Sequence, residues 1–504
     1  MVCLTRWRGE TRPLAAVFST AFAMRLMPEL WVLSYPVGYD APLYAVESAH
    51  LPEEDPLCML ARPPLVFAIL WAFHALGLDV CVVLKLLAPL LYGLLAVAFY
   101  GFLRKSLGWD TAKSCFCAIL CALQPTALRI SWDLLKMELG LTALFFLLAN
   151  FEGWRRAGKW PHISALATAI VLAHQLPAVL MFMFLAYEWW RERTLERALG
   201  LLAPTLPAAC LFLIQLLIFV GVVQTAPPVR FREVIWLEAS YGGMPVIGVS
   251  FPRNYFLERP FRSASWADVA LCVSFSFLVC FALLLPLALI GLRRYGFLDV
   301  LSAWLAFASF SVIACPWAYP FAHFFRWMLM LVFPMSIYAA EGALKLARRA
   351  GGRRALAVVL LLNAAVGVGY ANGLPYPSVG IPSPMMAYMP NRMTYSTVEL
   401  DQIDDCRACI TWLNAHAGNS SVLVVEQRFF AWALMWLDER VPIAVYRADT
   451  PLDDVELGGV LSAYEHVYTI WYVGQAPSWR GHTSLEVFRS GDIAVYEFSG
   501  GQGA

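Results

Sequence analysis

The sequence predicts a polytopic α-helical membrane protein with about 11 transmembrane helices and a small soluble α/β domain at the C-terminal end. The first observation is composition, because 60% of the 504 residues are hydrophobic and only 14% are charged. Soluble proteins are about 45–50% apolar and about 25% charged. The second is the occurrence of eleven apolar stretches in the first 371 residues, and the third is the Lys/Arg clusters in every second gap between them. The net charge of +1 gives no basis for nucleic-acid binding.

Each apolar stretch is read as a crossing of the bilayer, which needs roughly 20 apolar residues. The predicted spans lie near 13–33, 80–103, 113–128, 134–151, 161–175, 176–190, 198–223, 267–292, 298–315, 325–344 and 355–371. The first stretch contains Arg25 and is not followed by a small-residue cleavage pattern, so we expect a retained span and not a signal peptide.

The basic clusters predict the orientation of the chain in a plasma (cytoplasmic) membrane. The clusters are Arg6, Arg8 and Arg12; Arg104, Lys105 and Lys113; Arg155, Arg156 and Lys159; Arg191, Arg193 and Arg197; Arg293 and Arg294; and Lys345, Arg348, Arg349, Arg353 and Arg354. Loops rich in Lys and Arg face the cytoplasm. The N-terminus is therefore predicted inside and residues 372–504 outside.

The cytoplasmic placement of the basic clusters also decides how residues 62–78 and the external loops are assigned to domains. Residues 62–78 are apolar enough to cross, but a crossing there would invert every later cluster, so we expect interfacial helices within a first external loop, 34–79. This loop and a large external loop, 224–266, belong to a transmembrane domain, 1–371. A Pro-rich linker, 372–398, leads to an extracytoplasmic α/β domain, 399–504.

The pattern of the C-terminal domain alternates between strands and helices. Strands are predicted at 422–426, 443–446 and 466–473, followed by a hairpin that turns at Ser490 and Gly491. Amphipathic helices are predicted at 399–415, 427–438 and 453–464. From residue 372 onward there are 7 basic and 15 acidic residues, so the domain is acidic. Cys406 and Cys409 form one CxxC without a second pair, which favours a local disulfide or two inert thiols over zinc.

Two acidic residues are candidates for catalysis at the outer face. Asp40 follows the first span in the sequence SYPVGYDAPLY, where it is either a loop residue of a Pro/Gly-rich turn or a general base at the bilayer surface. Asp133 opens the fourth predicted span in SWDLLKMELG, where it is either a helix N-cap or a second catalytic acid.

Several basic residues are predicted in the same plane. Arg326 and His323 begin the tenth span, Lys136 lies one turn inside the fourth, and Arg62 starts the apolar part of the first loop. Arg326 is a candidate ligand of a lipid phosphate, with an interfacial anchor as the alternative. His174 is a lone outer-surface histidine for which a structural role is favoured.

The order of these motifs resembles the GT-C superfamily of integral-membrane glycosyltransferases, which includes protein O-mannosyltransferases and aminoarabinose transferases. The resemblance covers about the first 345 residues. It is carried by Arg-x-x-Pro before GYDAPLY, by Arg-Pro-Pro-Leu from Arg62, by SWDLLKMELGL at the fourth span and by FFRWMLMLVFP at the tenth.

The resemblance implies a transferase that takes a sugar from a polyprenyl-phosphate carrier and passes it to a protein, lipid or glycan acceptor on the extracytoplasmic face. It implies Asp40 and Asp133 as the catalytic acids and Arg326 as a ligand of the donor phosphate. Lys136 and Arg62 are further candidate ligands of that phosphate, from their predicted place in the same plane. A divalent cation, Mg or Mn, is expected as an optional cofactor held by Asp133 and His323. A single base opposite the leaving group predicts inversion at the anomeric carbon.

Two departures from the family pattern narrow this expectation. Many members carry Asp-Glu in the first loop, whereas Ala41 follows Asp40 here, which weakens a metal site at that pair. The C-terminal WWDxG-type motif of oligosaccharyltransferases is missing, so whole-oligosaccharide transfer is disfavoured. The alternatives are a transporter or flippase for a polyprenyl-linked substrate, and a non-catalytic membrane scaffold subunit.

Overall fold

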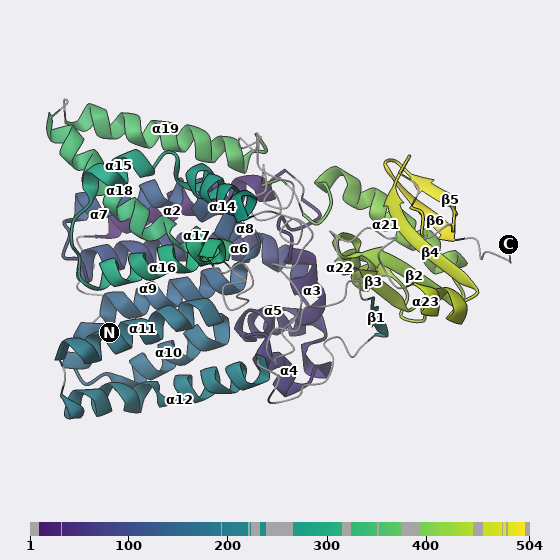
Figure 1. Cartoon of the computed structure of the whole chain (residues 1–504), viewed down its shortest axis with the longest axis horizontal. Helices are drawn as coiled ribbons and strands as arrows, with labels where there is room; N and C mark the ends of the chain where they lie inside the picture. The colour runs from purple at the N-terminus through teal and green to yellow at the C-terminus, as the bar shows by residue number, and fades with distance from the viewer. Residues whose placement is uncertain are drawn as a thin grey trace.

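The computed structural model describes most of the chain, and the fold is given for that part alone. The described residues are 10–31, 33–192, 194–219, 222, 232–237, 266–314, 324–349, 352–374, 393–394, 396–446, 457–475, 477–479 and 482–498. Within them a helical bundle is followed by a smaller domain built on a mixed sheet (Figure 1).

Each of the eleven predicted stretches is helical, and three of them are divided into two helices. The helices are α2 (Thr11–Glu29), α6 (Val80–Lys105), α7 (Thr111–Ala122) with α8 (Pro125–Asp133), α9 (Leu135–Arg156), α10 (Trp160–Ala173), α11 (Gln175–Glu192), α12 (Leu195–Phe219), α14 (Trp266–Phe281) with α15 (Leu285–Gly291), α16 (Phe297–Ala314), α17 (Phe324–Met330) with α18 (Val332–Arg349), and α19 (Arg353–Ala371).

Fewer helices than the eleven predicted spans are long and apolar enough to cross a membrane. In the described part, 4 helices qualify, or up to 6 if each of two bent pairs is one span. The bent pairs are α7 with α8, at 63°, and α14 with α15, at 80°. Helix α10 has only 14 residues, and the first turn of α9 contains the charged residues Lys136 and Glu138. The chain is thus a helical protein with four to six candidate membrane spans, and the eleven crossings stay a prediction.

The first predicted loop is helical, as expected. It contains α3 (Ala41–Ala49), the 3-10 helix η1 (Leu51–Glu53), α4 (Pro56–Ala61) and α5 (Leu65–Ala75). Pro64 is the N-cap of α5, and α5 packs against α3, α6, α9 and α10. These helices lie at the end of the bundle that faces the sheet domain (Figure 1).

Ion pairs at the other end of the bundle join the predicted cytoplasmic clusters. Arg104 at the end of α6 binds Glu10 just before α2, at 2.6 Å. Lys113 of α7 binds Glu341 of α18, in a pair that is mostly buried. Arg104 and Lys113 belong to one predicted cytoplasmic cluster, and the orientation of the chain in a membrane stays a prediction.

The sheet has six strands in the order β1-β3-β2-β4-β6-β5. The strands are β1 (Val234–Trp236), β2 (Ser421–Glu426), β3 (Ile443–Tyr446), β4 (His466–Tyr472), β5 (Ser484–Ser490) and β6 (Ile493–Phe498). The first four strands in this order, β1, β3, β2 and β4, run parallel to one another. Strand β6 is antiparallel to β4 and forms the predicted antiparallel hairpin with β5. The predicted strands of the C-terminal domain are confirmed, and Gly491 makes the turn with φ of 50°.

Strand β1 was not expected, because it comes from the predicted large external loop and not from the C-terminal domain. It pairs in parallel with β3, with Ile235 opposite Ala444. Arg232, just before β1, donates a hydrogen bond to the carbonyl of Leu437 at 2.8 Å. One edge strand of the sheet therefore comes from the middle of the predicted transmembrane domain. The predicted domain 399–504 does not include this strand.

The helices of the C-terminal domain attach it to the first loop. They are η3 (Leu400–Gln402), α21 (Ile403–His416), α22 (Gln427–Trp436) and α23 (Gly458–Ala463), and α22 packs against α3. The ring of Tyr35 lies edge-on to Trp432 and Trp436, and its hydroxyl donates to Asp404 at 2.7 Å. Cys406 and Cys409 are buried free thiols of α21, in agreement with the inert-thiol alternative.

Candidate active site

The two predicted catalytic acids are brought together where the first loop presses on α8. Asp40 is the residue before α3, and Asp133 is the last residue of α8. Gly38 has φ of 133°, a region that favours glycine, and a Cβ there would lie 2.1 Å from the carbonyl oxygen of Trp132. The loop can approach α8 this closely only because residue 38 has no side chain.

Asp40 has the properties of a base. Its side chain is half-buried and accepts no hydrogen bond from the backbone N–H groups at the start of α3. Burial, together with the negative charge of Asp133, raises the pKa of Asp40 to about 6, while Arg326 and Lys136 act to lower it. A carboxylate of this strength is largely ionised near neutral pH and can still accept a proton there.

Asp133 has a different local role from the N-cap considered above. Helix α8 ends at Asp133, and the N-cap of α9 is Leu134 without a side-chain capping bond, so the capping alternative is wrong. The Asp133 carboxylate instead forms a buried ion pair with Arg129, one turn earlier on α8. Tyr44 of α3 donates from its hydroxyl to the Asp133 carbonyl at 3.2 Å, which joins the two acid-bearing segments once more.

Two of the predicted phosphate ligands lie beside the acids. Lys136 of α9 is 5.7 Å from the ring centre of Tyr44 and 5.0 Å from that of Phe67, and its positive charge acts on Asp40. Arg326 of α17 also acts on Asp40, and its Nη1 lies 3.5 Å from Nε2 of His174. The positive charges of Lys136 and Arg326 therefore both act to keep the predicted base ionised.

Arg62 has other partners. Its guanidinium lies 2.5 Å from Glu47 and 3.3 Å from Glu54, on α3 and beside η1. A role in binding the donor phosphate would require these ion pairs to exchange, and that role stays a prediction. His323 lies outside the described residues.

The predicted cation site does not fit the surroundings of Asp133. Its carboxylate already faces Arg129, and Arg326 and Lys136 lie beside the neighbouring Asp40. A divalent cation prefers several oxygen or nitrogen donors, and here it would meet three positive side chains. No group of three or more His, Cys, Asp or Glu residues that could hold a metal occurs in the described part of the chain.

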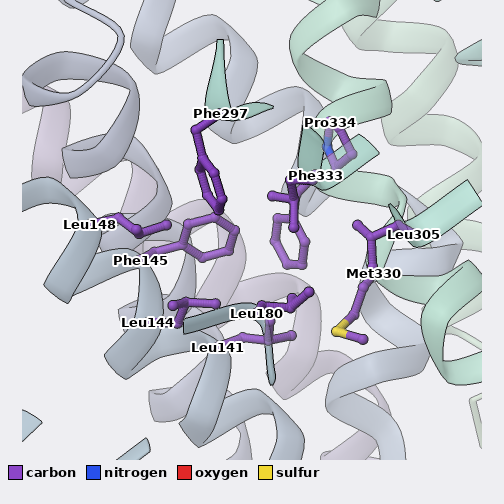
Figure 2. Close-up of a pocket in the computed structure, with 11 residues that line it drawn as sticks. Leu141, Leu144, Phe145, Leu148, Leu180, Phe297, Leu305, Met330, Phe333 and Pro334 are labelled. Carbon is purple, nitrogen blue, oxygen red and sulfur yellow. The ribbon is translucent and has the colours of Figure 1, made fainter. Parts of the chain in front are cut away.

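An apolar pocket, called the slot below, lies inside the helical bundle. It is lined by α9, α11, α16, α17 and α18, as Figure 2 shows, with a cavity volume of about 10 Å³. Two of its lining residues, Leu141 and Met330, follow Lys136 and Arg326 along α9 and α17, and Leu180 lies on α11, which begins just after His174. Lys136 and Arg326 therefore stand on two of the five helices that line the slot.

The end of the linker lies across both acid-bearing segments. The indole of Trp132 donates to the carbonyl of Met393 at 3.1 Å, and Ser396 donates to the carbonyl of Gly38 at 3.2 Å. The C-terminal domain thus begins directly at the site.

Sequence reasoning missed Arg129 and Tyr44. Arg129 stands four residues before Asp133, a spacing that pairs charges on a helix, but the predicted helix ended at 128 and left it in a loop. No comparable signal marks Tyr44, whose bond to Asp133 spans 89 residues. Searches against models of protein families and against curated proteins give no match to this chain.

Proposed function

We propose that this protein is a membrane glycosyltransferase that moves a sugar from a polyprenyl-phosphate carrier to an acceptor on the extracytoplasmic face. The observation that carries the proposal is a half-buried carboxylate, Asp40, on which the positive charges of Arg326 and Lys136 act, together with an apolar slot farther along the two helices that carry these cations. The arrangement suits a substrate with an anionic head and a hydrocarbon tail. The resemblance to GT-C enzymes supports the same reading.

In the proposed reaction, a hydroxyl of the acceptor attacks the anomeric carbon of the donor. Asp40 takes the hydroxyl proton as the new carbon–oxygen bond forms. The bond between the anomeric carbon and the phosphate oxygen breaks, and its electron pair stays on the lipid phosphate. Arg326 and Lys136 stabilise that added charge, so no metal is required. Attack opposite the leaving group inverts the configuration.

Asp133 acts on this chemistry through Asp40. Its negative charge is the second cause, after burial, of the raised pKa of Asp40, and Arg129 holds its carboxylate in place. Without that charge Asp40 would be a weaker base.

The slot is the proposed site of the carrier's hydrocarbon chain. At about 10 Å³ it is closed to a chain of that width. Binding therefore requires its lining side chains, such as Met330, to change rotamer, which the unbranched methionine side chain does readily.

The test is sugar transfer by purified protein in lipid vesicles, with a panel of polyprenyl-phosphate sugars. The Asp40→Asn variant is expected to lose nearly all turnover while it stays folded and binds donor. Asp55→Asn is the matched control, because Asp55 lies in the same loop and caps α4, a role that asparagine fills equally well. Turnover retained in Asp40→Asn, or lost equally in Asp55→Asn, would refute Asp40 as the base.

A second candidate, a transporter for a polyprenyl-linked substrate, is favoured by one observation. The two bent helix pairs meet near their breaks, where Thr126 of α8 donates to the carbonyl of Cys280 of α14 at 2.7 Å. Broken helices that face one another are typical of transporters. Movement of a labelled donor across vesicles by Asp40→Asn, with no transfer by the wild-type protein, would favour this candidate.

A further inference from the structure

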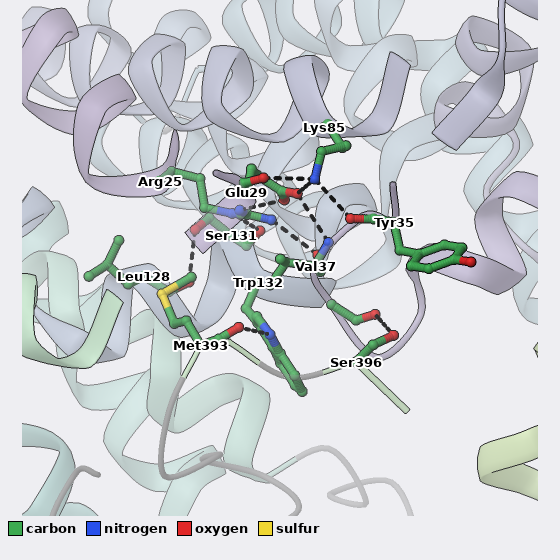
Figure 3. A network of polar contacts seen from close by, with 11 residues as sticks. Arg25, Glu29, Tyr35, Val37, Lys85, Leu128, Ser131, Trp132, Met393 and Ser396 are labelled. Atoms are coloured by element: carbon green, nitrogen blue, oxygen red, sulfur yellow. Dashed lines mark hydrogen bonds and ion pairs between the residues drawn. The ribbon is translucent and has the colours of Figure 1, made fainter. Parts of the chain in front are cut away.

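Three charged side chains that the proposed reaction does not use are buried beside the acids. Arg25 is 0% exposed, Glu29 1% and Lys85 9%. Arg25 Nη1 lies 2.7 Å from Glu29 Oε1, and Lys85 Nζ lies 3.3 Å from Glu29 Oε2. Figure 3 shows them as one connected group, the Arg25–Glu29–Lys85 network, which joins α2 to α6.

Arg25 reaches the backbone of both acid-bearing segments at once. Its Nε donates to the carbonyl of Ser131 at 3.0 Å, and its Nη2 donates to the carbonyl of Val37 at 3.3 Å. Ser131 belongs to the last turn of α8, which ends in Asp133, and Val37 belongs to the segment that leads to Asp40. One planar guanidinium therefore spans the two backbones that carry the acids.

Glu29 and Lys85 fix the loop side of this arrangement. The N–H of Val37 donates to Glu29 Oε2 at 3.1 Å, so Val37 is held through both its carbonyl and its amide. Lys85 Nζ donates to the carbonyl of Tyr35 at 2.8 Å and to that of Glu29 at 2.8 Å. The loop segment from Tyr35 to Val37 is thus tied to two helices by charged groups.

Stability alone is a poor reason to bury such a group. Taking ions out of water is costly, and replacing a buried ionic group by apolar side chains of similar volume is often neutral or stabilising. The partners of this network, in contrast, are backbone atoms close to the two acids. Its chemistry therefore suits fixing the positions of these segments.

We propose that the Arg25–Glu29–Lys85 network is a positioning device that sets the separation of Asp40 and Asp133. Its residues touch no substrate and act on turnover through the two acids. This inference rests on the proposed function, and the experiment has one readout that does not depend on it.

The main variant replaces all three residues together, as Arg25→Met, Glu29→Met and Lys85→Met, so that no charge of the network is left without its partner in the network. The matched control is Lys113→Met with Glu341→Met, which removes another buried ion pair at the far end of the bundle. Transfer kinetics and hydrogen–deuterium exchange of the amides in 35–40 are measured for both.

The triple variant is expected to fold, with the KM for the donor unchanged and kcat lowered about a hundredfold, the loss typical of a displacement of about 1 Å at a reacting group. Amides 35–40 should exchange faster, because Val37 N–H loses its acceptor. Lys85→Met alone should also lower kcat. Lys85→Arg should keep most of the wild-type rate, since arginine also donates hydrogen bonds to carbonyls. The control should resemble the wild-type protein in kcat and in exchange of the loop.

An unchanged kcat in the triple variant, or an equal fall in the control, would overturn the proposal. If the triple variant fails to fold, the Lys85→Met variant is the test. A lowered kcat with an unchanged KM for the donor would support the proposal, and an unchanged kcat would overturn it. If the wild-type protein transfers no sugar, the proposed function fails, but hydrogen–deuterium exchange still tests the network. If amides 35–40 exchange equally slowly in the wild-type protein and the triple variant, the network does not hold the loop.

Discussion

The pH dependence of transfer tests the electrostatics of the site, through two substitutions with opposite expected effects. Asp133 raises the pKa of Asp40 and Lys136 lowers it. Because Asp40 must be ionised to accept a proton, kcat/KM should rise with pH through an apparent pKa of about 6 in the wild-type protein. Asp133→Asn should move this acid limb to lower pH, and Lys136→Met should move it to higher pH.

The size of each shift follows from the charge that is removed. A neighbouring charge typically shifts a carboxyl pKa by about 1 unit or more. With a pKa of 6, the ratio of ionised Asp40 at pH 5 to that at pH 7 is about 0.1, and a shift of one unit changes the ratio to about 0.5 in Asp133→Asn and about 0.02 in Lys136→Met. Asp133→Asn also releases Arg129, whose charge lowers the pKa of Asp40 further, in the same direction.

The assay is the initial rate of transfer at low donor concentration between pH 4.5 and 8, scaled to each variant's own plateau. Scaling matters because both substitutions will also reduce the plateau, Lys136→Met through weaker stabilisation of the phosphate. Asp55→Asn serves again as the control with an unchanged limb. Limbs that coincide in all variants, or that move in the same direction, would refute the account of Asp40 as a base tuned by its charged neighbours.

Three further predictions concern the metal, the close approach of the loop and the domain contact. Turnover should be unaffected by EDTA, because Arg129 occupies Asp133, and a loss that added Mg or Mn restores would contradict this. Gly38→Ala should lower the melting temperature and abolish transfer, since strain of about 1–3 kcal/mol adds to the clash with Trp132. Gly77→Ala, with φ of 80° and nothing within 4 Å, is the control that bears only the strain. Tyr35→Ala should cost about 3–5 kcal/mol and speed proteolysis between the domains, as for other buried aromatic residues. Tyr35→Phe should cost about 1 kcal/mol, because water replaces the bond to the exposed Asp404.

Much of the architecture could be predicted because its signals are local. Apolar stretches placed the helices within a few residues, and alternation placed the strands of the C-terminal domain. The position of β1 could not be predicted, since a three-residue strand has no strong pattern and its partner, β3, lies 209 residues further along the chain, with Ile443 opposite Val234. The Arg25–Glu29–Lys85 network was missed for the same reason. Its bonds to Ser131 and Val37 depend on how the loop and α8 pack together, which no single stretch of sequence specifies.

The misreading of Asp133 shows how much chemistry depends on one helix boundary. The sequence allowed a helix that begins after Asp133, in which the carboxylate would cap backbone N–H groups and be unavailable for other contacts. The chain instead turns at Leu134, with φ of −93° and ψ of 45°, so that Asp133 ends the preceding helix. This shift brings Arg129 onto the same helical face as Asp133 and leaves the Asp133 charge beside Asp40. Next to this turn, Gly38 of the loop meets Trp132 of α8 with no room for a side chain. The second cause of the raised pKa of Asp40, after burial, therefore depends on a close contact between segments almost a hundred positions apart.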